Sequence, residues 1–175
     1  VCQRAREAGA VSFLDAVHYA PHGLMDVEAW GCDFLMCSAY KFFGPHVGIQ
    51  YGRRELLESL QPYKLRPATN NLPGRWMTGT QNHECIWGTR AAIDYMASIG
   101  GDMASGMPRR DALKMAFKSI KAYEESLLLR LLDGLQQIDG IKVWGITDPT
   151  RVHERCPTIS ITHERFTPRV VAERL

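Results

Sequence analysis

The stretches Asp15-Ala-Val-His18 and Cys37-Ser-Ala-Tyr-Lys-Phe-Phe-Gly-Pro-His-Val-Gly48 decide the fold class of this chain. Each stretch follows a short apolar run, at 11–14 and at 33–37. Short apolar runs that end in polar residues are typical of buried strands, and in α/β sheets the carboxyl ends of such strands carry the chemistry. The sequence therefore predicts two neighbouring strands with functional side chains at their ends.

An acid and a lysine follow these two strands. Asp15 ends the first run, and Lys41 lies just past the second. This pair suits a cofactor with a basic ring nitrogen and an aldehyde, and pyridoxal 5'-phosphate (PLP) is such a cofactor. A lysine holds PLP as a Schiff base, and a carboxylate keeps its pyridinium nitrogen charged. The alternatives are a surface lysine and an aspartate that caps a turn.

The ordered motifs resemble those of a known family. Asp-Ala-Val-His, the Asp33-Phe run, the lysine loop and Trp76-Met-Thr-Gly-Thr-Gln-Asn82 together resemble the class V aminotransferase group of PLP enzymes. Within that group, the resemblance is closest to the cysteine desulfurase and selenocysteine lyase-like branch. It has specific motifs from about residue 1 to residue 100, and beyond that it rests on the general layout.

The resemblance implies an α/β fold, the PLP-dependent transferase fold type I. Residues 1–105 would form the second half of the PLP-binding large domain. Residues 106–175 would hold a long connecting helix and the start of an α+β small C-terminal domain. Members of the family are roughly twice this long, so the chain is interpreted as the middle of a larger enzyme.

The resemblance also implies roles for individual residues. Lys41 would bind PLP and move protons, and Asp15 would pair with the pyridinium nitrogen. His18 would lie near the phenolic oxygen of PLP, with a buried structural histidine as the alternative. Ser38 would bind the phosphate. Tyr40 departs from the pattern, because cysteine desulfurases usually have histidine there, and tyrosine donates one hydrogen bond without a positive charge.

A second phosphate contact is implied at Gly79-Thr80, which resembles a pair that reaches the PLP of the neighbouring subunit. A glycine amide and a hydroxyl suit an oxyanion. This would make the protein a homodimer with shared active sites. The alternative is a loop end, with Thr80 capping the helix that begins near Asn82.

The implied reaction is that of a cysteine desulfurase, which converts cysteine to alanine and passes the sulfur to a protein thiolate, with a sulfur-acceptor protein as a further partner. The catalytic cysteine and the arginine for the substrate carboxylate would lie after residue 175. The alternatives are another class V enzyme (an aminotransferase, an epimerase or a selenocysteine lyase) and a non-catalytic PLP-fold subunit. An unrelated α/β binding domain would require the ordered motifs to be coincidence.

The amino-acid composition limits the class of protein and its expected cellular location. The chain has 175 residues, 45% hydrophobic and 23% charged, with a net charge of +2. This favours neither a nucleic-acid binder nor a membrane-surface binder, and no run reaches the roughly 20 apolar residues of a membrane span. Five cysteines, an odd number, suit reduced thiols and a cytoplasmic protein. Their spacing with histidines does not match a metal site.

Periodicity and turn residues predict the remaining elements. The apolar residues of 108–137 recur at helical spacing and predict a long helix; they are Leu113, Phe117, Ile120, Tyr123, Leu127 and Leu131. Further helices are expected at 1–9, 26–30, 53–60, 82–99 and from 167, and strands at 11–14, 33–37, 47–52, 141–144 and 158–162.

Overall fold

A computed structural model describes residues 1–77 and 79–175 of the chain. Its N-terminal part contains α1 (Cys2–Glu7), β1 (Phe13–Asp15), α2 (Val27–Trp30), β2 (Phe34–Ser38), the 3-10 helix η1 (Ala39–Phe42), β3 (Gly48–Gly52), α3 (Arg54–Ser59) and α4 (His83–Ser98). Its C-terminal part contains α5 (Arg109–Gln136), β4 (Ile141–Trp144), the 3-10 helix η4 (Pro149–Glu154), β5 (Ser160–His163) and α6 (Pro168–Arg174). Short 3-10 turns lie at Gly74–Trp76 and Gly101–Ala104.

The N-terminal part is built on a three-stranded mixed sheet in the order β1-β2-β3. β1 is parallel to β2, with Asp15 opposite Met36, and β3 is antiparallel to β2. Because β1 and β2 are parallel, their carboxyl ends meet at one edge. The two polar stretches of the sequence therefore start at the same edge of the sheet.

One face of the sheet carries the main core. Leu35 and Cys37 of β2 are buried and pack with Leu14, Ile49 and residues of α1 and α4. On the opposite face, Phe13 is 54% and Met36 38% exposed. Successive side chains of a strand point to opposite faces, so Asp15 and Ser38 lie on the same face as Phe13 and Met36.

A buried carboxylate fixes the other end of the strands. Asp33 accepts hydrogen bonds from the backbone N and Oγ of Ser12 (both 2.8 Å) and from Nη1 of Arg53 (2.9 Å). These bonds from Ser12, followed by the Arg53 bond, hold the pKa of Asp33 below its ordinary value. A charge satisfied in this way fixes the register of the neighbouring strands.

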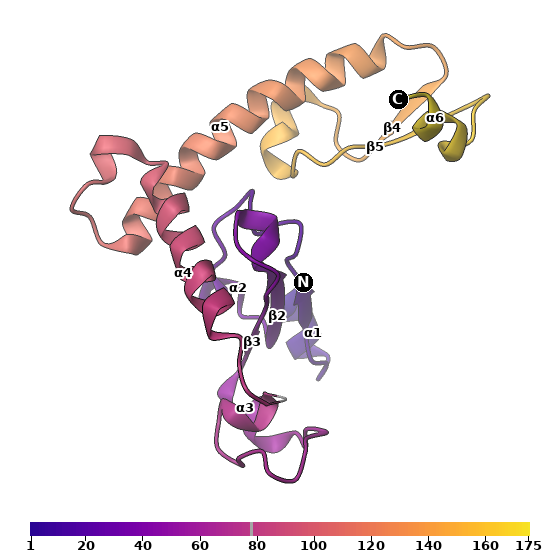
Figure 1. The fold of residues 1–175 in the computed structure, drawn as a ribbon. Coiled ribbons are helices and arrows are strands. Elements are labelled where there is room, and N and C mark those ends of the chain that lie inside the picture. The colour runs from indigo at the N-terminus through magenta and orange to yellow at the C-terminus, as the bar shows by residue number, and fades with distance from the viewer. Residues whose placement is uncertain (78) are drawn as a thin grey trace.

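The long helix α5 joins this body to a smaller unit that contains β4, β5 and α6, and the smaller unit extends sideways like an arm (Figure 1). β4 and β5 form an antiparallel two-stranded sheet. The core of this unit consists of Leu128, Leu132 and Val152, with Val143 and Ile159 packed against it.

The expected elements are present, with small shifts at their ends. The helices over 1–9, 26–30, 53–60, 82–99, 108–137 and from 167, and the strands at 47–52 and 141–144, are confirmed within a few residues. The first two strands begin and end later than predicted, so Asp15 and Ser38 are the last strand residues rather than the first loop residues. The last strand begins two residues late, at Ser160.

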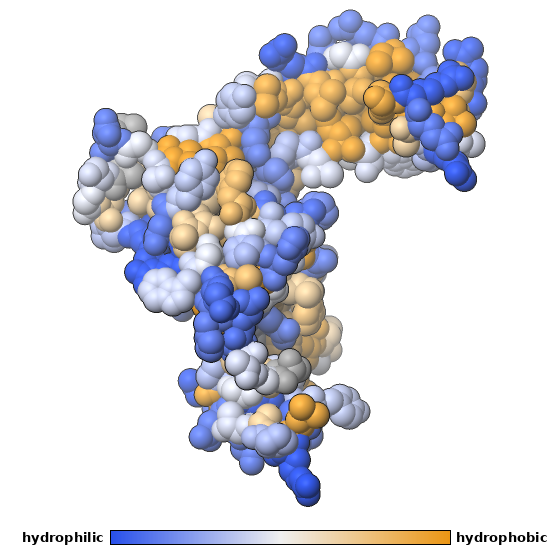
Figure 2. Space-filling view, viewed as in Figure 1, coloured by the Kyte–Doolittle hydropathy of each residue, from blue (hydrophilic) through white to orange (hydrophobic). Residues whose placement is uncertain are grey.

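The buried residues of α5 differ from the apolar residues whose spacing predicted the helix. Its buried residues are Ala112 and Ala116 in the first half and Leu128 and Leu132 in the second, whereas Leu127 is 43% exposed. At 100° per residue, Ala116 and Leu128 lie about 120° apart around the helix. α5 thus packs one side on α4 and another side on β4 and η4, and hydrophobic side chains remain visible along the arm (Figure 2).

Candidate functional site

The candidate site lies at the carboxyl edge of β1 and β2. The backbone N of Ala16 donates to the carbonyl O of Met36 (2.8 Å), which holds the two strand ends together directly after Asp15. Ser38 ends β2, and η1 begins at once with Ala39. The structure thereby brings Asp15, Ser38, Tyr40 and Lys41 to one edge of the sheet.

Asp15 has one engaged and one open oxygen. Its Oδ1 accepts a hydrogen bond from the backbone N of Val17 (2.9 Å), which is the turn-cap arrangement considered from the sequence. Among the described residues, its Oδ2 has no hydrogen-bond partner, and the residue is exposed. The cap and a cofactor contact are therefore compatible, because each uses a different oxygen.

Lys41 lies half-buried in the middle of η1. Its Nζ lies 5.1 Å from the centre of the Tyr40 ring, a cation–π contact. Within residues 1–77 and 79–175, no acceptor or carboxylate pairs with this ammonium group. In the part of the chain that the structure describes, the ammonium group therefore contacts an aromatic face and no charged partner, and its nitrogen remains available for chemistry.

The loop after the lysine has a constrained backbone. Phe43 adopts a left-handed conformation (φ 67°), which is costly for a residue with a side chain. The N of Gly44 donates to the O of Ala39 (2.9 Å), and a Cβ on Gly44 would lie 2.8 Å from Cβ of Ala39. Glycine is therefore required at position 44 for the turn that follows the lysine.

Tyr40 has a neighbour that the sequence analysis did not predict. The ring of His46 lies 5.3 Å from the ring of Tyr40, centre to centre. The Tyr40 ring is thus close to both an ammonium and an imidazole group, and both Tyr40 and His46 are exposed. The only sequence signal was a histidine five residues after the lysine.

His18 lies exposed on the turn that follows Asp15. No hydrogen bond of its ring occurs within the part of the chain that the structure describes, and the buried structural histidine considered from the sequence does not fit this exposure. Its place three residues after Asp15 keeps it close to the strand edge in sequence. Its role toward a cofactor stays a prediction.

Gly79 and Thr80 lie in the loop that precedes α4. No hydrogen bond joins either residue to Asp15, Ser38 or Lys41 among the described residues, and the neighbouring Thr78 of the quoted motif lies outside them. The helix α4 is capped by Asn82, whose Oδ1 accepts from the N of Cys85 (3.1 Å). Thr80 as the cap of this helix is therefore wrong.

α4 nevertheless packs against the lysine loop. A Cβ on Gly88 would lie 3.1 Å from Cγ of Pro45, and the rings of Phe43 and Tyr95 meet edge to face at 5.4 Å. The start of α4, which follows Gly79-Thr80, is thus fixed relative to Lys41. Contact with the PLP of a neighbouring subunit stays a prediction.

The donor set at the strand edge fits PLP. A half-buried lysine with an uncommitted nitrogen, a carboxylate with an open oxygen and a strand-end hydroxyl share one edge. A carboxylate, a primary amine and phosphate-binding donors are the groups that PLP sites use. Lys41, Asp15 and Ser38 are thus the residues that would hold the cofactor.

A reactive thiol and a metal site have less support in the structure. The thiol of Cys37, the next-to-last residue of β2, is buried, and this burial raises its pKa. The described residues contain no group of three or more His, Cys, Asp or Glu side chains arranged to hold a metal ion. Within the same residues, no helix has the length and apolar character needed to cross a membrane.

Comparison with known proteins indicates the family of the chain. A family model described as "Aminotransferase class-V" matches residues 1–175. A cysteine desulfurase of Pectobacterium carotovorum is 29% identical over 155 residues, which are 81% of this chain and 34% of that protein. A probable cysteine desulfurase of Xylella fastidiosa is 30% identical over 157 residues, 83% of this chain and 34% of that protein.

Solved structures show the same fold. An apo cysteine desulfurase from Thermococcus onnurineus superposes with a TM-score of 0.73 at 21% identity, over 98% of this chain and 41% of that one. A cysteine desulfurase from Escherichia coli gives a TM-score of 0.66 at 22% identity, over 94% of this chain and 39% of that one. The predicted α/β fold type I is confirmed as a part of the large-domain architecture of these proteins.

The fold is that of an α/β domain with a candidate cofactor site at the edge of its sheet. The chain belongs to the class V aminotransferase family, and within it the chain is cysteine desulfurase-like. It spans about a third of the length of the curated relatives it matches.

Proposed function

We propose that this chain is part of a PLP-dependent enzyme that acts on an amino acid, most closely a cysteine desulfurase. The observation that carries the proposal is the meeting of Asp15 and Lys41 at the carboxyl edge of two parallel strands. Named cysteine desulfurases among its relatives support the substrate class. The products would be alanine and sulfur carried on a protein thiolate.

Each residue at the strand edge would have a separate role toward the cofactor. When bound, PLP supplies an electron sink for the amino-acid substrate. Asp15 would hold a proton on the ring nitrogen through its open oxygen. Lys41 would attach the cofactor and then accept and return the substrate proton, with its ammonium form stabilised by the face of Tyr40. Ser38 would donate to the phosphate.

A second candidate is another amino-acid enzyme of the same family, such as an aminotransferase, an epimerase or a selenocysteine lyase. Tyr40 favours this reading, because the residue before the lysine is usually histidine in cysteine desulfurases. His46 lies against Tyr40 in this chain and offers an imidazole from a different position. Product analysis with cysteine in the presence of a dithiol separates the two: a desulfurase forms alanine and an enzyme persulfide, which the dithiol reduces to sulfide.

The proposal also includes the oligomeric state, the cellular location and a further partner. A homodimer with Gly79-Thr80 near the PLP of the neighbouring subunit is supported by large exposed apolar side chains in the preceding loop and on α4, namely Tyr63, Leu65, Ile86 and Trp87. A cytoplasmic location is supported by the free thiols of Cys2, Cys32 and Cys37, which are all buried. A sulfur-acceptor protein is the expected further partner of a desulfurase.

The test is borohydride reduction of the complete protein with PLP, followed by peptide mass mapping. We expect a pyridoxyl group on Lys41 and none in a Lys41→Ala variant. Lys64, a partly buried lysine that donates to the O of Ala68, serves as an internal control and should remain unmodified. A folded protein that carries no pyridoxyl group at Lys41 with PLP in excess would overturn the enzyme proposal.

A further inference from the structure

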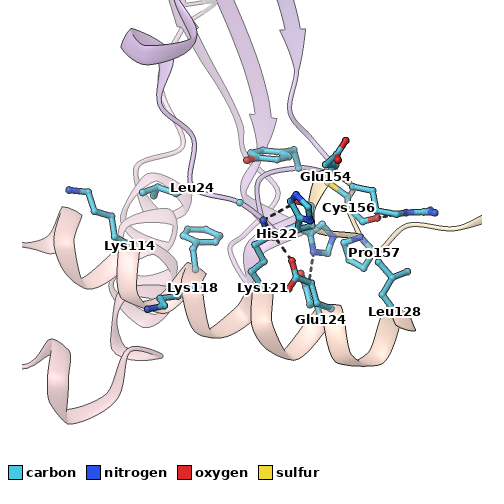
Figure 3. A pocket seen from close by; sticks show the side chains of 16 residues that line it. His22, Leu24, Lys114, Lys118, Lys121, Glu124, Leu128, Glu154, Cys156 and Pro157 are labelled. Atoms are coloured by element: carbon cyan, nitrogen blue, oxygen red, sulfur yellow. Dashed lines mark hydrogen bonds and ion pairs between the residues drawn. The ribbon is translucent and has the colours of Figure 1, made fainter. Parts of the chain in front are cut away.

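We propose that His22 and Glu124 form a positioning pair that fixes the turn carrying Asp15 and His18 against α5. The proposal rests on the proposed function, because it assigns a task toward the same cofactor residues. Nδ1 of His22 donates to Oε1 of Glu124 over 2.7 Å, and each side chain is only 24% exposed. The two residues are 102 positions apart, and Figure 3 shows their side chains pointing toward one another.

The turn transmits this contact to the strand edge. The N of Val17 donates to Oδ1 of Asp15, the N of Ala20 to the O of Ala16 (2.9 Å), and the N of Gly23 to the O of Tyr19 (3.1 Å). Overlapping hydrogen bonds of this kind make the segment from Asp15 to Gly23 one continuous turn structure. Fixing His22 therefore restricts the position of His18 and of the open oxygen of Asp15.

The residues that directly follow this segment are also held on α5. Nη1 of Arg110 donates to the O of Met25 (3.0 Å), and Nη2 contacts Oδ2 of Asp26 (3.1 Å). Arg110 and Glu124 are 14 residues apart, which is about 21 Å along a helix at 1.5 Å per residue. Two separated contacts fix both the position and the direction of the segment relative to α5.

Packing alone does not hold the turn at His22. A cavity of about 540 Å³ lies between the turn, α5 and residues 153–157. The groups around the pair are committed elsewhere: Nζ of Lys121 donates to the O of His153 (3.0 Å), and Glu154 pairs with Arg151 (2.7 Å). The His22–Glu124 contact thus bridges a space that side chains do not fill.

The pair also connects the cofactor edge with the C-terminal unit. Beyond Glu124, α5 continues into the core formed by Leu128, Leu132 and Val152. Cys156 lies beside the pair, and burial, with a smaller contribution from Glu124, raises the pKa of its thiol. A displacement of the C-terminal unit would therefore reach Asp15 through α5 and His22.

The test uses the complete protein and two readouts. Amide hydrogen exchange of residues 16–23 is measured without PLP, and the dissociation constant and visible circular dichroism of PLP are measured with it. For Glu124→Gln and His22→Ala we expect about tenfold faster exchange of the turn, as for loss of a charge-assisted hydrogen bond. We expect PLP to bind about fivefold more weakly, with a changed dichroic band per bound PLP.

Matched variants separate positioning from general stability. His22→Asn places an amide near the position of Nδ1 and should restore most of the exchange protection and the dichroic band. Glu125→Gln changes the neighbouring glutamate, whose Oε1 lies 3.7 Å from Lys121, and should leave both readouts unchanged. The double variant His22→Ala/Glu124→Gln should exceed neither single variant, because one interaction is removed in each case.

Additive effects of the two substitutions, or an unchanged turn in Glu124→Gln, would overturn the proposal. An altered turn with an unchanged dichroic band per bound PLP would overturn the positioning role as well. If the wild-type protein binds no PLP, the proposed function fails. Amide hydrogen exchange measured without PLP still decides whether the His22–Glu124 pair holds the turn.

Discussion

The sheet body and the C-terminal unit are stabilised in very different ways. The sheet body buries a core from three strands, the lysine loop, α1 and α4, and it adds the buried Asp33 cluster. The C-terminal unit has a core of Leu128, Leu132 and Val152 beneath a two-stranded sheet. Isolated two-stranded sheets are marginal in water, so this unit depends on its packing against α5.

This difference bears on function. The candidate cofactor residues lie on the better-packed body, where their positions are fixed by strand register and by a constrained loop. The unit with the smaller core reaches them through α5 and the His22–Glu124 contact. Because the C-terminal unit has the smaller core, it is expected to open more readily than the sheet body, and this contact is the route by which such a motion would reach the turn after Asp15.

The largest expected effect is on the core of the C-terminal unit. Leu132 is 3% exposed and belongs to that core, so Leu132→Ala should lower the free energy of unfolding of the unit by about 3 kcal/mol. Native-state hydrogen exchange should show faster exchange in β4 and β5, with the amides of β2 unchanged.

The neighbouring Leu131 provides the matched control. It is 51% exposed on the same helix, so Leu131→Ala should change the free energy of unfolding by less than about 0.5 kcal/mol. Equal effects of the two substitutions, or faster exchange in β2 as well, would show that the chain unfolds as one unit and that the two regions do not differ.

A smaller effect is expected at Asp33. Asp33→Asn removes the charge that Ser12 and Arg53 satisfy and should destabilise the sheet body by about 2 kcal/mol at neutral pH. The midpoint of urea denaturation, followed by tryptophan fluorescence, measures this loss of stability. Asp139→Asn, at an exposed position, should have no such effect.

The contribution of Asp33 should also depend on pH. Its folded-state pKa is lowered, chiefly by the hydrogen bonds from Ser12, so its contribution is fully present above the unfolded value of about 4. It is lost as the pH falls through the lower folded-state value. The difference between wild type and Asp33→Asn should therefore shrink on acidification, and a constant difference would contradict this explanation.

The sequence predicted the ends of β1 and β2 to within one residue, because polar residues follow short apolar runs there. Asp15 and Lys41 follow apolar runs, and the turn after the lysine requires Gly44, so local patterns were sufficient. The buried face of α5 was not predictable in the same way. Which side of a helix is buried depends on the partners, and α5 has different partners along its two halves.

Long-range polar contacts were likewise missed. His22 and Glu124 are each ordinary in their own segments, and only the fold brings them to 2.7 Å. The same holds for Asp33 and Ser12, which are 21 residues apart and carry no motif. A local sequence pattern can indicate candidate site residues, whereas contacts between distant segments become visible only in the fold.

The smallest expected effect concerns the start of α4, where the helix cap and the proposed phosphate contact occupy neighbouring residues. Asn82→Ala removes the hydrogen bond to the N of Cys85 and should cost about 1 kcal/mol of stability. Thr80→Ala leaves that cap intact, so thermal unfolding of the PLP-free protein should not change. Its expected effect is weaker binding of PLP, and only in the dimer if the hydroxyl reaches the neighbouring subunit. Destabilisation of the PLP-free protein by Thr80→Ala, with unchanged PLP affinity, would instead assign Thr80 to the structure of the loop and leave the sheet edge as the whole of the cofactor site in this chain.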